Sequence, residues 1–200
     1  MNIERRNTGA GEVRMEGEGE AKRMAGYAAV FFREGDAGTE YRLWDGAVER
    51  IMPEAFAGVA DQDVRALFNH DSNMLLGRST AGTLALSVDD TGLRYEIDAG
   101  DTTVGRDVKT HLERGDLTGS SFGFRVTREE WVERDGQPDL RLIRGVDLYD
   151  VGPVTFPAYE STNAGLRTEG GDAEARASHE KWVQEKKDAE DRKTRMQDRG

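Results

Sequence analysis

Apolar residues in this chain recur mostly at the spacing of β-strands. Met24–Phe32 is a nearly continuous apolar run, short enough for a buried strand. Leu84–Val88 and Leu93–Ile97 instead have an apolar residue at every second position, on either side of a polar segment that ends at Gly92. This alternation around a glycine-containing turn predicts an antiparallel hairpin with one face in solvent.

Other strand-like segments alternate with two helical ones. Pro53 suits the first turn of a short helix over Pro53–Val59. Thr102 or Thr103 can cap a longer helix that runs to about Arg114, with Gly115 as its stop. The further predicted strands are Leu43–Ile51 with a turn at Asp45-Gly46, Val64–Asp71, residues 131–132 and 140–143 around Asp135-Gly136, and Val146–Ala158.

The apolar content changes at both ends of the chain. Residues 1–23 are rich in charged residues and glycine, so we expect a flexible leader or an edge strand there. Residues 24–166 carry the alternating patterns and are expected to form one folded domain. Residues 167–200 are almost all charged or small, which predicts a tail that is disordered or forms a solvated helix. The fold class indicated is α+β, mainly β.

Composition narrows the classes of protein. The chain has 200 residues, no cysteine and a net charge of −11. Its length favours a single domain without disulfides, and the lack of cysteine excludes thiolate metal sites and a cysteine nucleophile. The negative charge argues against a nucleic-acid partner. No segment reaches the ~20 apolar residues of a membrane helix, so we expect neither membrane insertion nor secretion by a signal peptide.

A serine nucleophile is the strongest candidate chemistry. Gly115–Val126 leads from the predicted helix into a strand, and Phe122 and Phe124 fall on one face of that strand. Ser121 and Gly123 point to the other face, whereas Ser120 shares the face of the phenylalanines. Strand parity therefore favours Ser121 as the nucleophile, although a serine at a strand edge is more often only a backbone hydrogen-bond partner.

A base is expected among the three histidines of the chain. His179 lies in the charged tail, and His111 falls on the inner stripe of the predicted helix, where a structural role is simpler. His70 ends a predicted strand and is the leading base. Three scattered histidines offer no metal-ligand spacing, and the glycines match no phosphate-binding pattern, so we expect no metal and no cofactor.

The residue that orients the histidine is less defined. Asp71, Asp147 and Asp150 are all candidates, and Asp71 is expected to point away from its neighbour His70 on a strand. Asp150 precedes a buried strand end. Arg78 is a candidate to line the site or to stabilise an oxyanion, although a surface arginine is its default interpretation.

Several of these segments, in this order, resemble the tailed-phage prohead maturation proteases. The resemblance covers about Gly26 to Ala164, most of the predicted domain, and depends on the combination of motifs. The segments that carry it are Ile51–Phe56, Phe68–Asp71, Leu76–Arg78, Gly115–Leu117, Gly119–Phe124 and Asp150–Ala158.

Members of that family are serine endopeptidases whose fold is similar to that of herpesvirus assemblins, a partly closed antiparallel β-barrel surrounded by helices. The resemblance implies that His70 is the family histidine and Ser121 the nucleophile, with Gly123 and Arg78 lining the site. Asp150 stands where glutamate is common in the family. The third catalytic member stays open among Asp150, Asp147, Asp71 and, since herpesvirus enzymes use a second histidine, His111.

The resemblance also implies a biological setting. The family cleaves scaffold protein, or the scaffold-like region of the major capsid protein, and then itself, inside the immature prohead in the host cytoplasm. The charged tail would target the enzyme to the shell or be removed by self-cleavage. Oligomeric state stays open, including a homo-oligomer. The alternatives are an inactive scaffolding component with a protease-like core and a non-viral β-barrel binding module.

Overall fold

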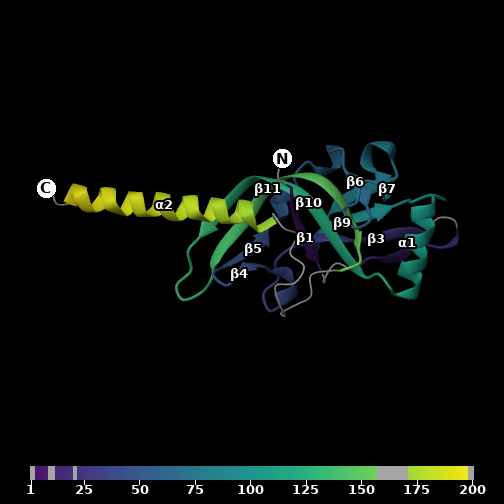
Figure 1. Cartoon of the computed structure of the whole chain (residues 1–200), viewed down its shortest axis with the longest axis horizontal. Helices are drawn as coiled ribbons and strands as arrows, with labels where there is room; N and C mark the ends of the chain where they lie inside the picture. Colours follow the sequence, from purple (N-terminus) through teal and green to yellow (C-terminus); the bar gives the residue numbers. More distant parts are fainter. Residues whose placement is uncertain (1–2, 9–11, 20–21, 157–170, 198–200) are drawn as a thin grey trace.

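The computed structural model describes residues 3–8, 12–19, 22–156 and 171–197. They form a seven-stranded sheet in the order β1-β10-β11-β5-β4, with β6 and β7 attached beside β11, and a four-stranded sheet in the order β2-β3-β9-β8 (Figure 1). The strands are β1 (Glu4–Thr8), β2 (Arg14–Glu16), β3 (Arg23–Val30), β4 (Tyr41–Trp44), β5 (Ala47–Ile51), β6 (Arg65–Leu67), β7 (Leu75–Arg78), β8 (Leu84–Val88), β9 (Gly92–Ile97), β10 (Gly119–Val132) and β11 (Asp139–Val154).

The helices include four short 3-10 turns and two α-helices. They are η2 (Ala37–Thr39), η3 (Pro53–Phe56), η4 (Val59–Asp61), η5 (Ser79–Ala81), α1 (Thr103–Arg114) and α2 (Gly171–Gln197). The class predicted from sequence, α+β and mainly β, is confirmed. The described residues form no closed barrel. The expected antiparallel order is wrong at β11, which pairs in parallel with both β5 and β6.

The long hairpin of β10 and β11 is the centre of the larger sheet. The sequence predicted two strands and a separate hairpin here, because the alternation of apolar residues is interrupted. The structure has two continuous strands whose antiparallel register shifts at three places, between Gly123 and Phe124 and twice between Val126 and Glu129. Such bulges insert residues without ending a strand, so they break the sequence pattern but not the pairing.

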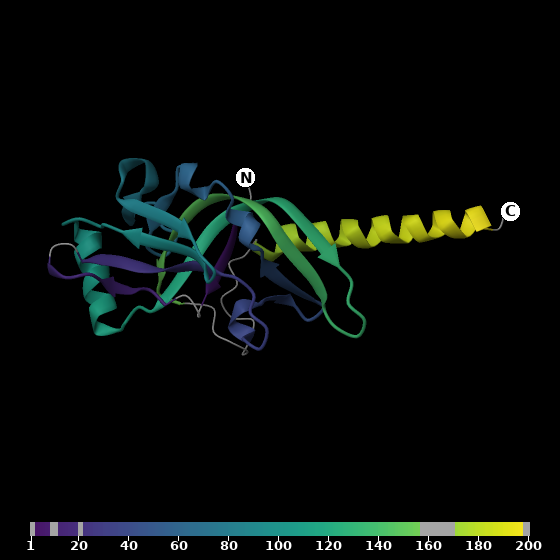
Figure 2. The same cartoon turned by 180° about the vertical axis from the view of Figure 1, so that it is seen from behind.

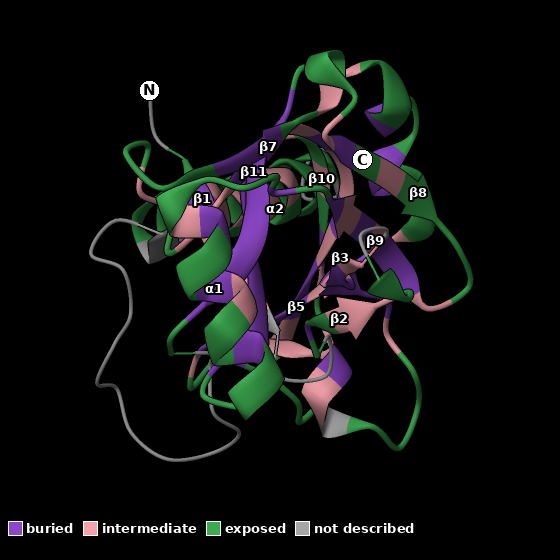
Figure 3. Ribbon diagram, turned by 90° about the vertical axis from the view of Figure 1, so that its right-hand side faces the viewer, coloured by how far each residue is buried: buried purple, intermediate pink, exposed green. Residues whose placement is uncertain are grey.

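One apolar core draws side chains from both sheets. Phe122 and Phe124 of β10 are fully buried, stacked with ring centroids 4.7 Å apart, and belong to the same buried cluster as Tyr95 and Ile97 of β9. The hairpin of β8 and β9 was predicted correctly, and its outer strand faces solvent at alternate positions. Figure 3 shows the inner strands as mainly buried and α1 as mainly exposed.

Helix α1 begins and ends as its capping residues predict. The Thr102 hydroxyl accepts a hydrogen bond from the N–H of Gly105 at 2.9 Å, and Gly115 closes the helix with φ 78°. Val108 and Leu112 are buried, but His111 is exposed and contacts Asp116 instead. The expected inner position of His111 is therefore wrong, because the buried stripe is only wide enough for its apolar neighbours.

The leader region contributes two strands. β2 pairs with β3, and β1 forms the edge of the larger sheet by pairing with β10, so strands occur among the described residues of the predicted leader. Ion pairs hold two side chains of β1. Glu4 and Arg6 are buried and form ion pairs with Arg141 of β11 and Glu49 of β5. We call Glu4, Arg6, Glu49, Glu129 and Arg141 the buried charge cluster.

Helix α2 is attached to the larger sheet near its N-terminal end and extends away from it (Figures 1 and 2). Ala175 is buried against Leu43 and Trp131, and Trp182 packs on Trp131 with ring centroids 6.2 Å apart. The Trp131 indole N–H donates to the Ser178 hydroxyl at 2.9 Å. The tail predicted over 167–200 as disordered or helical is thus helical over 171–197.

Glu49 connects stability to pH. Burial would by itself raise the pKa of this carboxyl, but the charges of Arg6 and Arg141 lower it overall from its ordinary value of 4.5. The unfolded chain then binds more protons than the folded one below this value. We expect the contribution of Glu49 to the free energy of unfolding to be fully present above pH 4.5. This contribution should be lost as the pH falls further below that value.

The measurement is urea unfolding of the wild type, Glu49→Gln and Glu113→Gln between pH 7 and pH 3. Glu49→Gln leaves two buried guanidinium groups short of a partner, which is expected to cost about 3–5 kcal/mol at pH 7 and to flatten the acid dependence. Glu113 is a half-exposed partner of Lys22, so its variant should behave as the wild type within about 0.5 kcal/mol. An unchanged acid slope in Glu49→Gln would contradict the assignment.

Candidate active site

Three side chains far apart in the sequence meet beside the β10–β11 hairpin. Nε2 of His70 lies 2.6 Å from Oγ of Ser121, and Nδ1 of His70 contacts Oδ2 of Asp150. The side chains of His70 and Asp150 are each 9% exposed. A carboxylate on Nδ1 keeps the ring proton there, so that Nε2 is free to accept the serine proton. This is the geometry of an activated hydroxyl nucleophile.

The two adjacent serines have different partners, as strand parity predicts. Ser121 points to His70, whereas the Ser120 hydroxyl lies 2.7 Å from the phenol oxygen of Tyr95 in the core. Burial raises the pKa of Tyr95, so its phenol stays protonated and can donate to Ser120. Gly26 packs against this pair, because a methyl group there would approach both oxygens to 3.1 Å. Ser120 is thus part of the packing of β10 on the second sheet.

His70 is presented by an unusual turn after β6. Asn69 and His70 both have positive φ, 55° and 58°, a conformation that costs energy for residues other than glycine. Asn69 holds the turn to the end of β11. Its backbone N–H donates to the Pro153 carbonyl at 3.1 Å, and its side-chain amide exchanges hydrogen bonds with Thr155 at 2.9 and 2.8 Å. Sequence reasoning missed Asn69, although asparagine before a functional residue is typical of this conformation.

Gly123 leaves room for the carboxylate of Asp150. The two residues are opposite each other in the β10–β11 register, and a methyl group at Gly123 would collide with Oδ1 of Asp150. Gly123 therefore lies beside Asp150, and its role in lining a site stays a prediction. Gly152 lies opposite Ser121 and is equally restricted, because a methyl group there would collide with the backbone carbonyl of Leu67 in β6.

Arg78, which was predicted to line the site, binds a different residue. Arg78 makes a bidentate pair with Asp63, with Nε and Nη2 at 2.8 and 2.7 Å from the carboxylate oxygens. The hydrogen bonds from Arg78 lower the pKa of Asp63, and the same pairing raises the pKa of Arg78. Since this guanidinium is bound outside the Ser121 environment, the geometry does not support an oxyanion role for it.

The other candidates for the third member also lie apart from Ser121. Asp147 pairs with Arg125 on the exposed side of the hairpin, Asp71 accepts hydrogen bonds from the backbone and side chain of Asn73 at 2.8 and 2.9 Å, and His111 binds Asp116. Of the four candidates, Asp150, Asp147, Asp71 and His111, only Asp150 contacts His70.

Ser121 is covered by the N-terminal strand. Its side chain is 0% exposed. Ser121 is opposite Asn7 in the β1–β10 register, and its hydroxyl lies in position to donate to the backbone carbonyl of Arg6 at 3.0 Å. Ser121 therefore contacts His70 but is closed to solvent in this structure. Sequence reasoning missed this contact, because the leader carries no apolar pattern that would place it in a sheet.

A family model described as caudovirus prohead serine protease matches residues 10–176. The chain belongs to this family. The resemblance inferred from the sequence is thereby confirmed. No curated protein and no solved structure matches the chain. Family membership links this prohead protease relative to hydrolase chemistry and phage capsid maturation.

Among the described residues, no group of three or more histidine, aspartate or glutamate side chains is arranged to hold a metal ion. No described helix combines the length and apolar character needed to cross a membrane. The Ser121, His70 and Asp150 group is the arrangement that this prohead protease family member offers for chemistry.

Replacing Gly123 by alanine is expected to separate Asp150 from His70 with little loss of stability. The collision is with the end of a flexible side chain, which can rotate away. Gly123 is buried, but the contact can be relieved by rotation of one side chain, so the free energy of unfolding should fall by about 1 kcal/mol, near the centre of the range for point substitutions. In proton NMR, we expect the wild type to show a far-downfield Nδ1–H resonance from His70 and Gly123→Ala to lose it.

Gly152→Ala is the matched comparison. Its methyl group would meet backbone rather than a side-chain end, so it should lower the free energy of unfolding by about 1–3 kcal/mol or more. If the downfield resonance persists in folded Gly123→Ala, the space at Gly123 is not what positions Asp150.

Proposed function

We propose that the chain is an active serine endopeptidase in which Ser121 is the nucleophile, His70 the general base and acid, and Asp150 the residue that orients His70. The observation that carries the proposal is the unbroken series of contacts from the Ser121 hydroxyl through both ring nitrogens of His70 to the Asp150 carboxylate. Ser121 lies in β10, Asp150 in β11 and His70 in the turn after β6. Local structure alone therefore does not explain why these three side chains meet.

The geometry supports acyl transfer. Ser121 attacks the peptide carbonyl as Nε2 of His70 takes its proton, and the imidazolium that forms is stabilised by Asp150. His70 then gives this proton to the leaving amine, which leaves an acyl group on Ser121. Water, deprotonated by His70, releases the acyl group and restores the hydroxyl. The buried position of Asp150 strengthens its interaction with the imidazolium.

Oxyanion stabilisation is assigned to backbone N–H groups near Ser121. Arg78 was considered for this role, but its guanidinium binds Asp63. Gly123 contributes by leaving space for Asp150 rather than by a side chain. Backbone donors in a strand are fixed before the reaction begins, which is what stabilises a developing negative charge.

The proposed substrates are extended segments of scaffold protein, or of the scaffold-like region of the major capsid protein, and the chain itself. The support is membership of the prohead serine protease family. The proposed location is the interior of the immature prohead in the host cell. The partly closed barrel of herpesvirus assemblins stays a prediction for the fold, and association into a homo-oligomer stays a prediction for the active form.

A second candidate function is a capsid-assembly component that keeps the protease core without activity. The complete burial of Ser121 under β1 favours it. A serine-directed phosphonate distinguishes the two, because only a competent nucleophile is labelled in folded protein, and labelling must disappear in Ser121→Ala.

Processing of the capsid protein tests the nucleophile and the base. We expect Ser121→Ala and His70→Ala to lower the initial rate of cleavage, after co-expression with the capsid protein, by at least about a thousandfold. Ser120→Ala and His111→Ala are matched controls, because these residues bind Tyr95 and Asp116 instead. Normal processing by Ser121→Ala or His70→Ala would contradict the proposal.

The third member is tested separately. Asp150→Asn keeps the size of the side chain but loses the charge that stabilises the His70 cation, so the cleavage rate should fall by about a thousandfold or more. Asp147→Asn changes a neighbouring acid of the same strand that pairs with Arg125 in solvent, and its rate should stay within about twofold of the wild type. Equal losses in the two variants would exclude a special role for Asp150.

A further inference from the structure

We propose that β1 is an autoinhibitory strand: it occupies the edge of β10 where an extended peptide substrate must pair, and the enzyme is latent until β1 leaves. The inference rests on the proposed function, because it explains how a buried Ser121 becomes available. It assigns both a mode of substrate binding and a regulatory role to residues that the catalytic chemistry does not use.

The first argument is position. β1 pairs antiparallel with β10 from Glu4 opposite Phe124 to Thr8 opposite Ser120, so it lies directly beside Ser121 along the edge of the sheet. The Asn7 side-chain amide also donates to the Phe156 carbonyl at 3.2 Å, beyond the end of β11, which extends the cover along the site. A carbonyl carbon cannot reach Ser121 while this strand is in place.

The second argument concerns one proton. The Ser121 hydroxyl has a single hydrogen, but two acceptors lie within reach of it, Nε2 of His70 at 2.6 Å and the Arg6 carbonyl at 3.0 Å. Donation to the carbonyl removes the hydrogen from the path along which His70 must take it. β1 therefore blocks the activation of the nucleophile as well as access to it.

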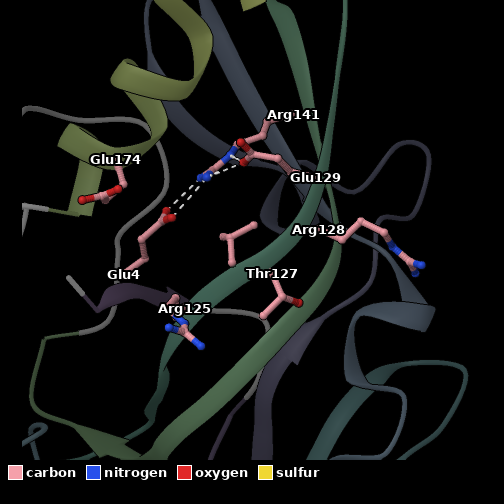
Figure 4. Close-up of a pocket in the computed structure, with 8 residues that line it drawn as sticks. Glu4, Arg125, Thr127, Arg128, Glu129, Arg141 and Glu174 are labelled. Atoms are coloured by element: carbon pink, nitrogen blue, oxygen red, sulfur yellow. Dashed lines mark hydrogen bonds and ion pairs between the residues drawn. The ribbon is translucent and has the colours of Figure 1, made fainter. Parts of the chain in front are cut away.

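The third argument is how β1 is held. Arg6 binds Glu49 with Nε and Oε1 2.7 Å apart. Glu4 binds Arg141 with Oε2 and Nη1 2.8 Å apart, as Figure 4 shows. Glu4 and Arg6 share one face of the strand, whereas Arg5 is only partly buried. A strand held by charge can be hydrated when it leaves, unlike a strand held by apolar side chains.

Beneath β1, the cluster keeps partners of its own. Arg141 binds Glu49 at 2.8 Å and also Glu129, so these three charges stay paired when Arg6 is absent. A pocket beside Glu4 is lined by Arg125, Thr127, Arg128, Glu129, Arg141 and Glu174, which brings water-accessible space next to the point where β1 is attached (Figure 4).

The fourth argument comes from the family match, which begins at residue 10. β1 ends at Thr8, before the matched region begins, whereas Ser121, His70 and Asp150 lie inside it. The proposed catalytic residues therefore belong to the part of the chain that the family model matches, and β1 does not. When β1 leaves, the backbone groups on that edge of β10 become free, and an extended, unfolded peptide is the class of substrate that pairs with such an edge.

The test uses the full chain and a fluorophosphonate probe, with labelling of Ser121 followed by mass spectrometry. The wild type is expected to react slowly. Arg6→Ala is expected to react at least about tenfold faster, because weakening the attachment of β1 by ~1.4 kcal/mol raises the open population tenfold. Arg14→Ala is the matched control, since Arg14 is an exposed residue that pairs with Glu16 in β2, and it should react as the wild type does.

Hydrogen exchange on the same samples measures opening of residues 4–8 independently of labelling. The double variant Glu4→Ala with Arg6→Ala removes the two charges of β1 that are buried in the cluster. It is expected to lose protection from exchange in residues 4–8 and to be labelled fastest. Its far-ultraviolet circular dichroism spectrum should be unchanged. Faster exchange in β1 without faster labelling would overturn the inference while leaving the proposed function intact. Undiminished protection of β1 in the double variant would overturn the role of the charge cluster. No labelling in any variant would remove the proposed function and this inference together.

Discussion

The antiparallel pairing of β10 and β11 is the constraint on which the site depends. It places Ser121 and Asp150 on neighbouring strands, two residues apart in register, before any side-chain interaction is considered. Because the rise along a strand is about 3.3 Å per residue, a slip of one residue would turn one of the two side chains to the opposite face. Gly123 and Gly152 allow this close packing, one beside Asp150 and the other beside β6. His70 then needs only a short turn, held by Asn69, to lie between the serine and the acid.

Two kinds of interior support the domain, and they have different consequences. The apolar core between the sheets fixes β10 from within, through Phe122 and Phe124. The buried charge cluster fixes β1, β5 and β11 on the same face of the sheet, where Arg6 is opposite Phe122 in register and its guanidinium lies over the ring of Phe124. Exposing an apolar core costs free energy, whereas buried ion pairs give little net stability and can be exchanged for water. The apolar part of the interior therefore holds β10 firmly, and the charged part holds β1 less firmly.

Local patterns in the sequence predicted much of the fold. The β8–β9 hairpin, the caps of α1 and the orientation of Ser121 follow from alternation and turn residues, which act over a few positions. Long-range features were not predictable in this way. The pairing of β1 could not be predicted, because the partners of Arg6 and Glu4 lie 43 and 137 positions away in Glu49 and Arg141. The parallel pairing of β11 with β5 and β6 also cannot be predicted from periodicity, since it joins strands that are distant in the chain.

The cluster at the base of α2 has a spectroscopic consequence. The chain has three tryptophans, and Trp44, Trp131 and Trp182 all belong to this one cluster with Ala175. Intrinsic tryptophan fluorescence therefore reports on whether the helix is attached to the sheet, not on the environment of Ser121. Detachment of α2 would change the emission of the whole protein while Ser121, His70 and Asp150 stay in place. Movements around Ser121, conversely, would leave the tryptophan emission almost constant.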